Sequence, residues 1–224
     1  MFFSWDMIYE GKFNFWAFKL SGIIILLFFL QLMISGFTDL FVLNNNVYSG
    51  EIWRLLTAVF LHASVAHLVF NLFALILFGS ILERLIGDKK FLLVFFVTGI
   101  LANLFSVNFY PSSLGASGAI FGVIGALIII RPGLPVWAFG MPMPIFVAGI
   151  IWAGADILGA VGFFTGNSIS NTGNLAHLSG MLFGFLFGIF YRRAIKSIKQ
   201  SSGNKIQIRF DESSLRNWEE DYLK

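Results

Sequence analysis

The chain has 224 residues, of which 57% are hydrophobic and 12% are charged, and its net charge is +3. This composition excludes an ordinary soluble domain, in which about a quarter of the residues are charged. Because a membrane-spanning segment must satisfy its own backbone hydrogen bonds, the sequence predicts an all-α polytopic membrane protein. The charge indicates no nucleic-acid partner, and the lack of cysteine excludes disulfides and cysteine-based metal sites.

Six apolar stretches, separated by clusters of polar residues, glycine or proline, are predicted to be the membrane helices. They cover residues 17–35, 65–82, 91–109, 117–130, 144–161 and 174–191. The fourth is too short to span the bilayer, so the uncharged loop before it must dip into the membrane. Irregular backbone at that depth must be buried in protein or line a water-filled cavity, so we expect a wet pocket open to the outside.

The pattern divides the chain into three parts. Residues 1–16 are expected to be a cytoplasmic N-terminal segment, and residues 193–224 a polar cytoplasmic tail. Residues 17–192 are expected to form the six-helix domain, with a long loop at 36–64. Every lysine and arginine except Arg54 falls on one side of the six helices, and basic residues stay on the cytoplasmic side. Both termini are therefore expected in the cytoplasm of a multi-pass protein of the cell membrane.

Three helices carry a polar side chain at nearly the same depth. Counted from the charged residue that closes each helix on the cytoplasmic side, Ser117, His177 and His67 lie about 21 to 24 Å from that boundary. Asn71 follows His67 by four residues and therefore shares a helix face with it. Polar groups within a bilayer are costly and normally face the protein or a wet cavity, so these four residues indicate a functional site.

The four residue types fit nucleophilic acyl transfer. Ser117, in LGASGAIFG, stands at a loop-to-helix junction, where free backbone N–H groups favour a developing anion. His177 can act as the base, while His67 and Asn71 can direct donors at one point. Glycines follow Ser117 and His177 at intervals of four, and such stripes let helices pack closely. This packing is expected to bring the serine within hydrogen-bond reach of His177.

Each residue also has a structural interpretation. Alone, Ser117 would be a packing residue, a membrane histidine would bond a neighbouring helix or bind an ion, and Asn71 would join two helices. His62, in the loop before the second helix, is expected to hold local structure through a hydrogen bond. Asp156 is a candidate third member of a triad with His177, but helix capping or loop anchoring is its expected role.

Over about residues 50–190 the chain resembles the rhomboid intramembrane serine proteases. The resemblance rests on Trp53 and Arg54, on His62, His67 and Asn71 in the spacing HxxxxHxxxN, and on the segments FGSILER, GASGAIFG and AHLSGMLFG. It implies a rhomboid-like bundle of six transmembrane helices and a catalytic dyad of Ser117 and His177. It also implies an oxyanion hole made by His67, Asn71 and the Ser117 backbone N–H, with no metal and no organic cofactor.

Gly115, Gly118, Phe121 and His62 are expected to support this site. Some members of the family carry a tyrosine where this chain has Phe121, four residues after the serine. A phenylalanine ring can still pack against His177, but it cannot make the hydrogen bond of a phenol.

The expected activity is that of a serine endopeptidase that cuts transmembrane segments of membrane proteins near the outer face. Its partners would be transmembrane protein substrates and the lipid bilayer, with no nucleic acid and no metal. Two alternatives belong to other classes. A catalytically silent rhomboid-like protein would bind or escort membrane proteins, and a small transporter or channel would use the polar residues as an ion path.

Overall fold

A computed structural model describes residues 13–166 and 173–203 of the chain. Most of the predicted N-terminal segment, to residue 12, and the tail from residue 204 lie outside the described residues. The chain divides into two compact units, Met1–Arg192 and Arg193–Lys224. In the second unit the described part is the helical continuation of the last helix to Gly203.

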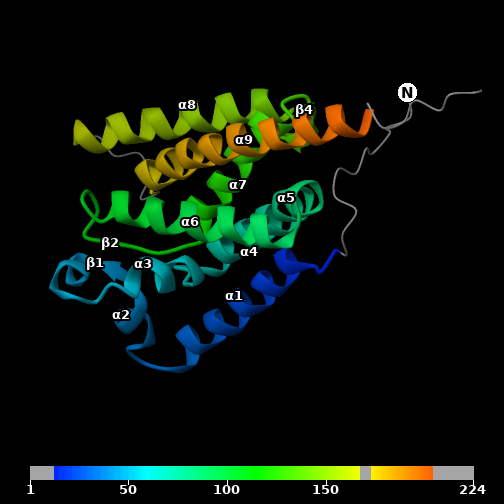
Figure 1. Cartoon of the computed structure of the whole chain (residues 1–224). Helices are drawn as coiled ribbons and strands as arrows, with labels where there is room; N and C mark the ends of the chain where they lie inside the picture. Colours follow the sequence, from blue (N-terminus) through cyan, green and yellow to red (C-terminus); the bar gives the residue numbers. More distant parts are fainter. Residues whose placement is uncertain (1–12, 167–172, 204–224) are drawn as a thin grey trace, which may run out of the picture. The chain divides into compact units, whose positions relative to one another are not determined.

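Five helical segments of the described chain are long and apolar enough to cross a membrane (Figure 1). They are α1 (Trp16–Met33), the continuous run of α4 (Val65–Ala74), the π-helical turn η3 (Leu75–Gly79) and α5 (Ser80–Ile86), then α6 (Asp88–Ser106), α8 (Ile145–Phe164) and α9 (Asn174–Gly203). Between them, α7 (Ser117–Ile130) is apolar but only 14 residues long. The prediction of a polytopic helical membrane protein with a short fourth helix is therefore confirmed.

A buried carboxylate joins the first helix to the second span. Glu83 of α5 is 1% exposed and accepts hydrogen bonds from the backbone N–H groups of Trp16, at 2.9 Å, and Ala17, at 3.1 Å. The first N–H groups of a helix have no partner inside that helix, and its positive end favours an anion. Glu83 therefore determines where α1 begins and attaches it to α5.

The long loop between the first two spans folds into short elements with a small core. These are α2 (Phe37–Phe41), β1 (Leu43–Asn44), η1 (Asn45–Ser49), α3 (Arg54–Thr57) and η2 (Ala58–Phe60). Leu43, Val47 and Ala58 bury their side chains together with Val107, which follows α6. Burial of these apolar groups orders a segment that has no long helix of its own.

Arg54 is the basic residue that the charge pattern placed apart from all others. It is 4% exposed and pairs with the side chain of Glu51. Its guanidinium also donates to the carbonyl oxygens of Asp39, at 2.7 Å, and Val42, at 2.8 Å. A buried charge needs such partners, so Arg54 holds the loop together from within.

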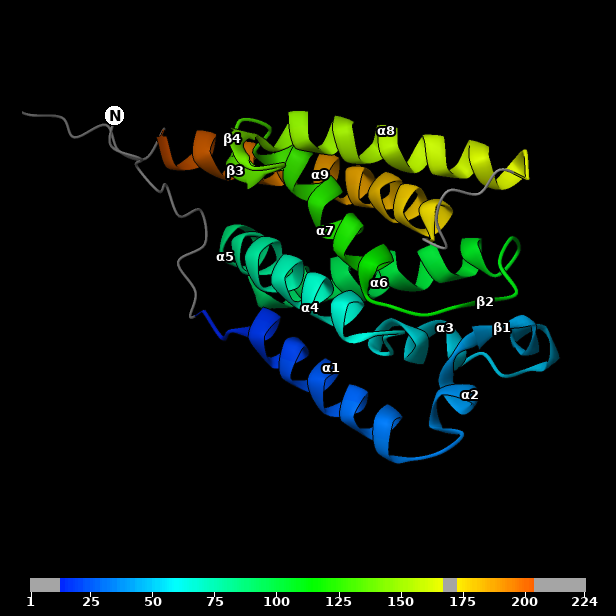
Figure 2. The same ribbon diagram turned by 180° about the vertical axis from the view of Figure 1, so that it is seen from behind.

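A β-hairpin that the sequence did not predict connects α7 to α8 (Figure 2). Strands β3 (Pro135–Ala138) and β4 (Met141–Pro144) pair antiparallel, with Ala138 opposite Met141. Phe139 and Gly140 form the turn with φ values of 53° and 79°. A two-residue turn of type I′ requires positive φ at both positions, which favours the glycine at position 140.

The helix α7 lies between α6 and α9 in both views (Figures 1 and 2). A Cβ atom at Gly180 would lie 2.1 Å from the carbonyl oxygen of Gly118, and one at Gly184 would lie 2.0 Å from that of Gly122. Only hydrogen fits at these positions, so the backbones of α7 and α9 touch. The close packing predicted from the glycine stripes is therefore confirmed.

The backbone contact yields a stability prediction. Gly184→Ala should lower the free energy of unfolding by about 1 to 3 kcal/mol, because the added methyl group forces α9 away from α7. The matched control is Gly154→Ala on α8, where a Cβ atom would meet nothing within 4 Å, and it should be neutral or stabilising by up to about 1 kcal/mol. Unfolding in mixed micelles measures both, and equal stabilities would contradict the packing argument.

Candidate active site

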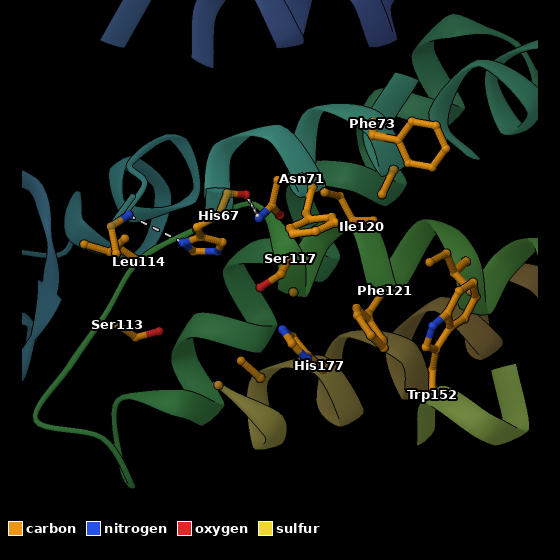
Figure 3. Close-up of a pocket in the computed structure, with 18 of the residues that line it drawn as sticks. His67, Asn71, Phe73, Ser113, Leu114, Ser117, Ile120, Phe121, Trp152 and His177 are labelled. Atoms are coloured by element: carbon orange, nitrogen blue, oxygen red, sulfur yellow. Dashed lines mark hydrogen bonds between the residues drawn. The ribbon is translucent and has the colours of Figure 1, made fainter. Parts of the chain in front are cut away.

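Ser117, His177, His67 and Asn71 line one cavity of about 820 Å³ (Figure 3). They come from α7, α9 and α4, and most of the remaining lining is apolar, with Phe70 of α4 among it. The structure thus brings together the four polar residues that the sequence grouped by depth.

Ser117 is the first residue of α7 and is half-buried, as the predicted loop-to-helix junction requires. The chain enters the helix through Gly115, whose φ is 128° and whose N–H donates to the carbonyl of Ala58 at 2.9 Å. A Cβ atom at Gly115 would lie 2.7 Å from Cε1 of His67. Glycine is therefore required here both by the backbone conformation and by the neighbouring ring.

The segment before Gly115 is also tied to the long loop. Strand β2 (Ser112–Ser113) pairs antiparallel with β1, with Leu43 opposite Ser113. This pairing satisfies backbone groups in an irregular segment that enters the membrane domain, where unpaired groups are costly. It holds the approach to α7 in one position.

His177 lies half-buried on α9 and faces the same part of the cavity as Ser117 (Figure 3). The ring of Phe121 stacks on it, with centroids 4.3 Å apart and planes 4° from parallel. The packing expected of Phe121 is therefore present. Within the described chain, however, no hydrogen bond joins Ser117 to His177. Hydrogen bonds of a nucleophile to its base are commonly long without substrate and tighten when it binds.

Asp156 makes the contact with His177 that the sequence analysis gave as the alternative, and it does not have the role expected there. It lies inside α8, is 7% exposed, and its Oδ1 is 3.0 Å from Nδ1 of His177. The expectation that it caps a helix or anchors a loop is therefore wrong. Nothing in the sequence gave the register of the fifth helix against the sixth, which decides this contact.

His67 and Asn71 are held by neighbours on or before α4 (Figure 3). The N–H of Ala63 approaches Nδ1 of His67 at 3.4 Å, so Nδ1 accepts and Nε2 carries the ring proton. The side-chain amide of Asn71 donates to the carbonyl of His67 at 2.8 Å. Ser64 accepts from the N–H of His67 at 3.1 Å and caps the helix, a role that its position just before the apolar run could have indicated.

His62 lies beside the cavity and is 2% exposed. Its backbone N–H donates to Oε1 of Gln31 at 2.9 Å, and its carbonyl accepts from Nε2 of Gln31 at 3.3 Å. The backbone, and not the ring, thus makes the hydrogen bonds that hold this loop, and both ring nitrogens are buried without a partner in the described residues. The sequence analysis missed Gln31, although a polar residue inside an apolar span is itself a signal.

The described residues contain no group of three or more His, Asp or Glu side chains arranged to hold a metal ion. The cavity brings together a hydroxyl, two imidazoles and a primary amide, and the carboxylate of Asp156 contacts one of the imidazoles. These groups can exchange protons and stabilise an anion near Ser117.

The chain is similar in sequence to known proteins. Residues 49–194 match the family described as Rhomboid domain. The chain is 37% identical over 170 residues to Rhomboid protease GluP of Bacillus subtilis, covering 72% of this chain and 32% of GluP. It is 29% identical over 178 residues to Rhomboid protease GlpG of Haemophilus influenzae, covering 75% of this chain and 86% of GlpG.

A further relative is from a plant. The chain is 33% identical over 144 residues to RHOMBOID-like protein 6, mitochondrial, of Arabidopsis thaliana, covering 63% of this chain and 44% of that protein. The alignments thus span about a third of GluP and less than half of the plant protein, but most of GlpG.

The stacked ring yields a prediction about the reactivity of Ser117. Phe121→Tyr keeps the stack and should leave the rate of labelling by a fluorophosphonate within about 2-fold. Phe121→Ala removes a contact worth about 0.5 to 1.5 kcal/mol and should slow labelling by about 2- to 10-fold. If alanine labels as fast as phenylalanine, the stack does not orient His177.

His62 yields a prediction about acid stability. Burial, and then the neighbouring His67, lower the pKa of His62 to about 4. The unfolded chain binds this proton near pH 6.5, so stability is lost as the pH falls from there toward 4, by up to about 3 kcal/mol. His62→Phe should flatten this loss in unfolding measured between pH 7 and 4, and an unchanged pH slope would contradict it.

Proposed function

The chain belongs to the rhomboid family, and from this premise we propose that it is an intramembrane serine endopeptidase with Ser117 as nucleophile and His177 as general base. The observation that carries the proposal is the meeting of Ser117 and His177 in one cavity with His67 and Asn71. Alone, each of these residues could be a packing or helix-joining group. Together they supply a nucleophile, a base and donors for an anion.

The reaction begins with proton transfer. Nε2 of His177 takes the hydroxyl proton of Ser117 as Oγ attacks the carbonyl carbon of the scissile peptide bond. The tetrahedral intermediate then collapses: the C–N bond breaks, and His177 gives the proton to the leaving amine. A water molecule, deprotonated by His177, hydrolyses the resulting ester and returns Ser117 to its starting state.

The negative oxygen of the intermediate is proposed to bind three donors. These are the backbone N–H of Ser117, the Nε2–H of His67 and the side-chain amide of Asn71. The accepting state of the His67 Nδ1 supports this role, because it leaves the ring proton on Nε2. The N-terminal end of α7 adds a favourable dipole at the same place.

Four further residues are proposed to support the site. Gly115 leaves space for the ring of His67, and Phe121 stacks on His177. Gly118 lets α7 approach α6, since a Cβ atom there would lie 2.7 Å from that of Ala102. His62 holds the loop before α4 through its backbone.

The proposed substrates are transmembrane segments of other proteins. The cavity is lined mainly by apolar residues, which suits a lipid-soluble chain. A helix hides its carbonyl groups in hydrogen bonds, so a substrate must unwind locally, and glycine or proline near the cut would favour this. The distribution of basic residues supports a multi-pass protein of the cell membrane with both termini in the cytoplasm. With this orientation the site lies near the outer face. The reaction as written uses no metal and no cofactor.

Labelling of the purified protein with a fluorophosphonate tests this proposal. Wild type should be labelled, Ser117→Ala should not, and His177→Ala should be slower by about 10²- to 10⁴-fold because the base is lost. Ser113→Ala is the matched control, since Ser113 lines the same cavity and should be dispensable. Cleavage of a transmembrane reporter in vesicles should show the same ranking: wild type and Ser113→Ala are active, His177→Ala is much slower, and Ser117→Ala is inactive.

Other outcomes would overturn the assignment. A folded wild type that binds transmembrane segments but is neither labelled nor active would indicate an escort protein. Ion or solute flux that survives Ser117→Ala would indicate a transporter or channel.

A further inference from the structure

We propose that Asp156 is a positioning residue for His177. The carboxylate orients the histidine, and the histidine acts on Ser117, whereas the family resemblance implied only the histidine and the serine. The inference rests on the proposed function of Ser117 and His177. The observation behind it is the 3.0 Å contact between Oδ1 of Asp156 and Nδ1 of His177, whose side chains are 10% and 14% exposed. An ionisable group inside a membrane helix is rare and costly, so its placement against the base needs a reason.

The carboxylate determines which nitrogen of His177 carries the proton. An ionised carboxylate only accepts hydrogen bonds, so Nδ1 of the neutral ring must be protonated to meet it. The unprotonated Nε2 is then free to accept the proton of Ser117. In the opposite tautomer Nδ1 would present a lone pair to the carboxylate, and Nε2 would carry a proton and could not act as a base.

The carboxylate also favours the state that follows. When His177 takes the proton from Ser117 it becomes a cation, and Asp156 provides the opposite charge at hydrogen-bond distance. With both side chains largely shielded from water, this attraction is stronger than in solvent. Asp156 touches no reacting atom, so its effect passes through His177.

The register of α8 against α9 produces this contact as part of a continuous interface. Gly159 lies three residues after Asp156, and Asn174 lies three residues before His177, so both pairs are one helical turn apart. A Cβ atom at Gly159 would lie 2.3 Å from the side-chain nitrogen of Asn174. The antiparallel helices therefore approach closely at Gly159, and this approach holds Asp156 against the ring.

A purely structural role is the competing explanation, in which the pair only joins α8 to α9. Asp156→Asn distinguishes the structural explanation from the positioning role. Asparagine keeps the size of the side chain and an acceptor oxygen, but it removes the charge and can pair with either tautomer of His177. Gly159→Ala provides the comparison, since it disturbs the same interface without altering the aspartate itself.

The kinetic test uses a transmembrane reporter in vesicles. Asp156→Asn should lower kcat by about 10- to 100-fold with KM nearly unchanged, because the base is misoriented while the binding cavity is intact. Its thermal unfolding should stay close to that of wild type, whereas Gly159→Ala should unfold at lower temperature. Asp156→Glu, which keeps the carboxylate, should recover part of the rate. A wild-type kcat in Asp156→Asn would overturn the proposal.

The tautomer can be measured without any activity. The chain has three histidines, so selective ¹⁵N labelling gives three ring systems, and His177→Ala identifies the one of interest. Wild type should carry the His177 proton on Nδ1, and Asp156→Asn should shift the population toward Nε2. If His177 of wild type is protonated on Nε2, the proposal fails even where Asp156→Asn does not fold. A wild type that is correctly protonated but inert would instead contradict the proposed function.

Discussion

Backbone contact between α7 and α9 is the constraint on which the rest of the site depends. In lipid, helices gain no hydrophobic energy from associating, so close packing of small residues must hold them together. Gly118, whose carbonyl meets Gly180, directly follows Ser117, and Gly180 is one turn beyond His177. The contact that stabilises the two helices is therefore also the contact that sets the separation of serine and histidine. Any larger side chain at Gly180 would move His177 away from Ser117.

The cavity is lined by two histidines whose rings have different neighbours. Nδ1 of His67 accepts from the N–H of Ala63, whereas Nδ1 of His177 faces the carboxylate of Asp156. Under the tautomers proposed above, Nε2 carries a proton in His67 and a lone pair in His177. One can donate to an anion and the other can accept a proton. In the proposed mechanism, the group behind each ring decides whether that histidine is a donor or a base, and neither of these groups touches the reacting atoms.

Polar partners also hold the irregular parts of the chain at the site. The side chain of Gln31 bonds both backbone groups of His62, and Ser64 caps the helix that carries His67. Arg54 gathers carbonyl groups inside the long loop. Each satisfies backbone that neither helix nor lipid could satisfy, which is the main cost of non-helical structure in a membrane protein. The loops around Ser117 are consequently held by specific bonds as well as by packing.

Much of this protein could be predicted from its sequence, because apolar length is a local property. The six apolar helices, the short one among them, and the shared depth of Ser117, His177 and His67 all follow from counting residues along the chain. Glycine spacing likewise indicated which helices touch, since only glycine permits that approach. The hairpin after α7 and the hydrogen bonds of Gln31 to His62 were not predicted, and the pairing of Asp156 with His177 was only one of two alternatives. They depend on the rotation and register of one helix against another, which many side chains determine together, so only the tertiary structure decided which polar groups meet.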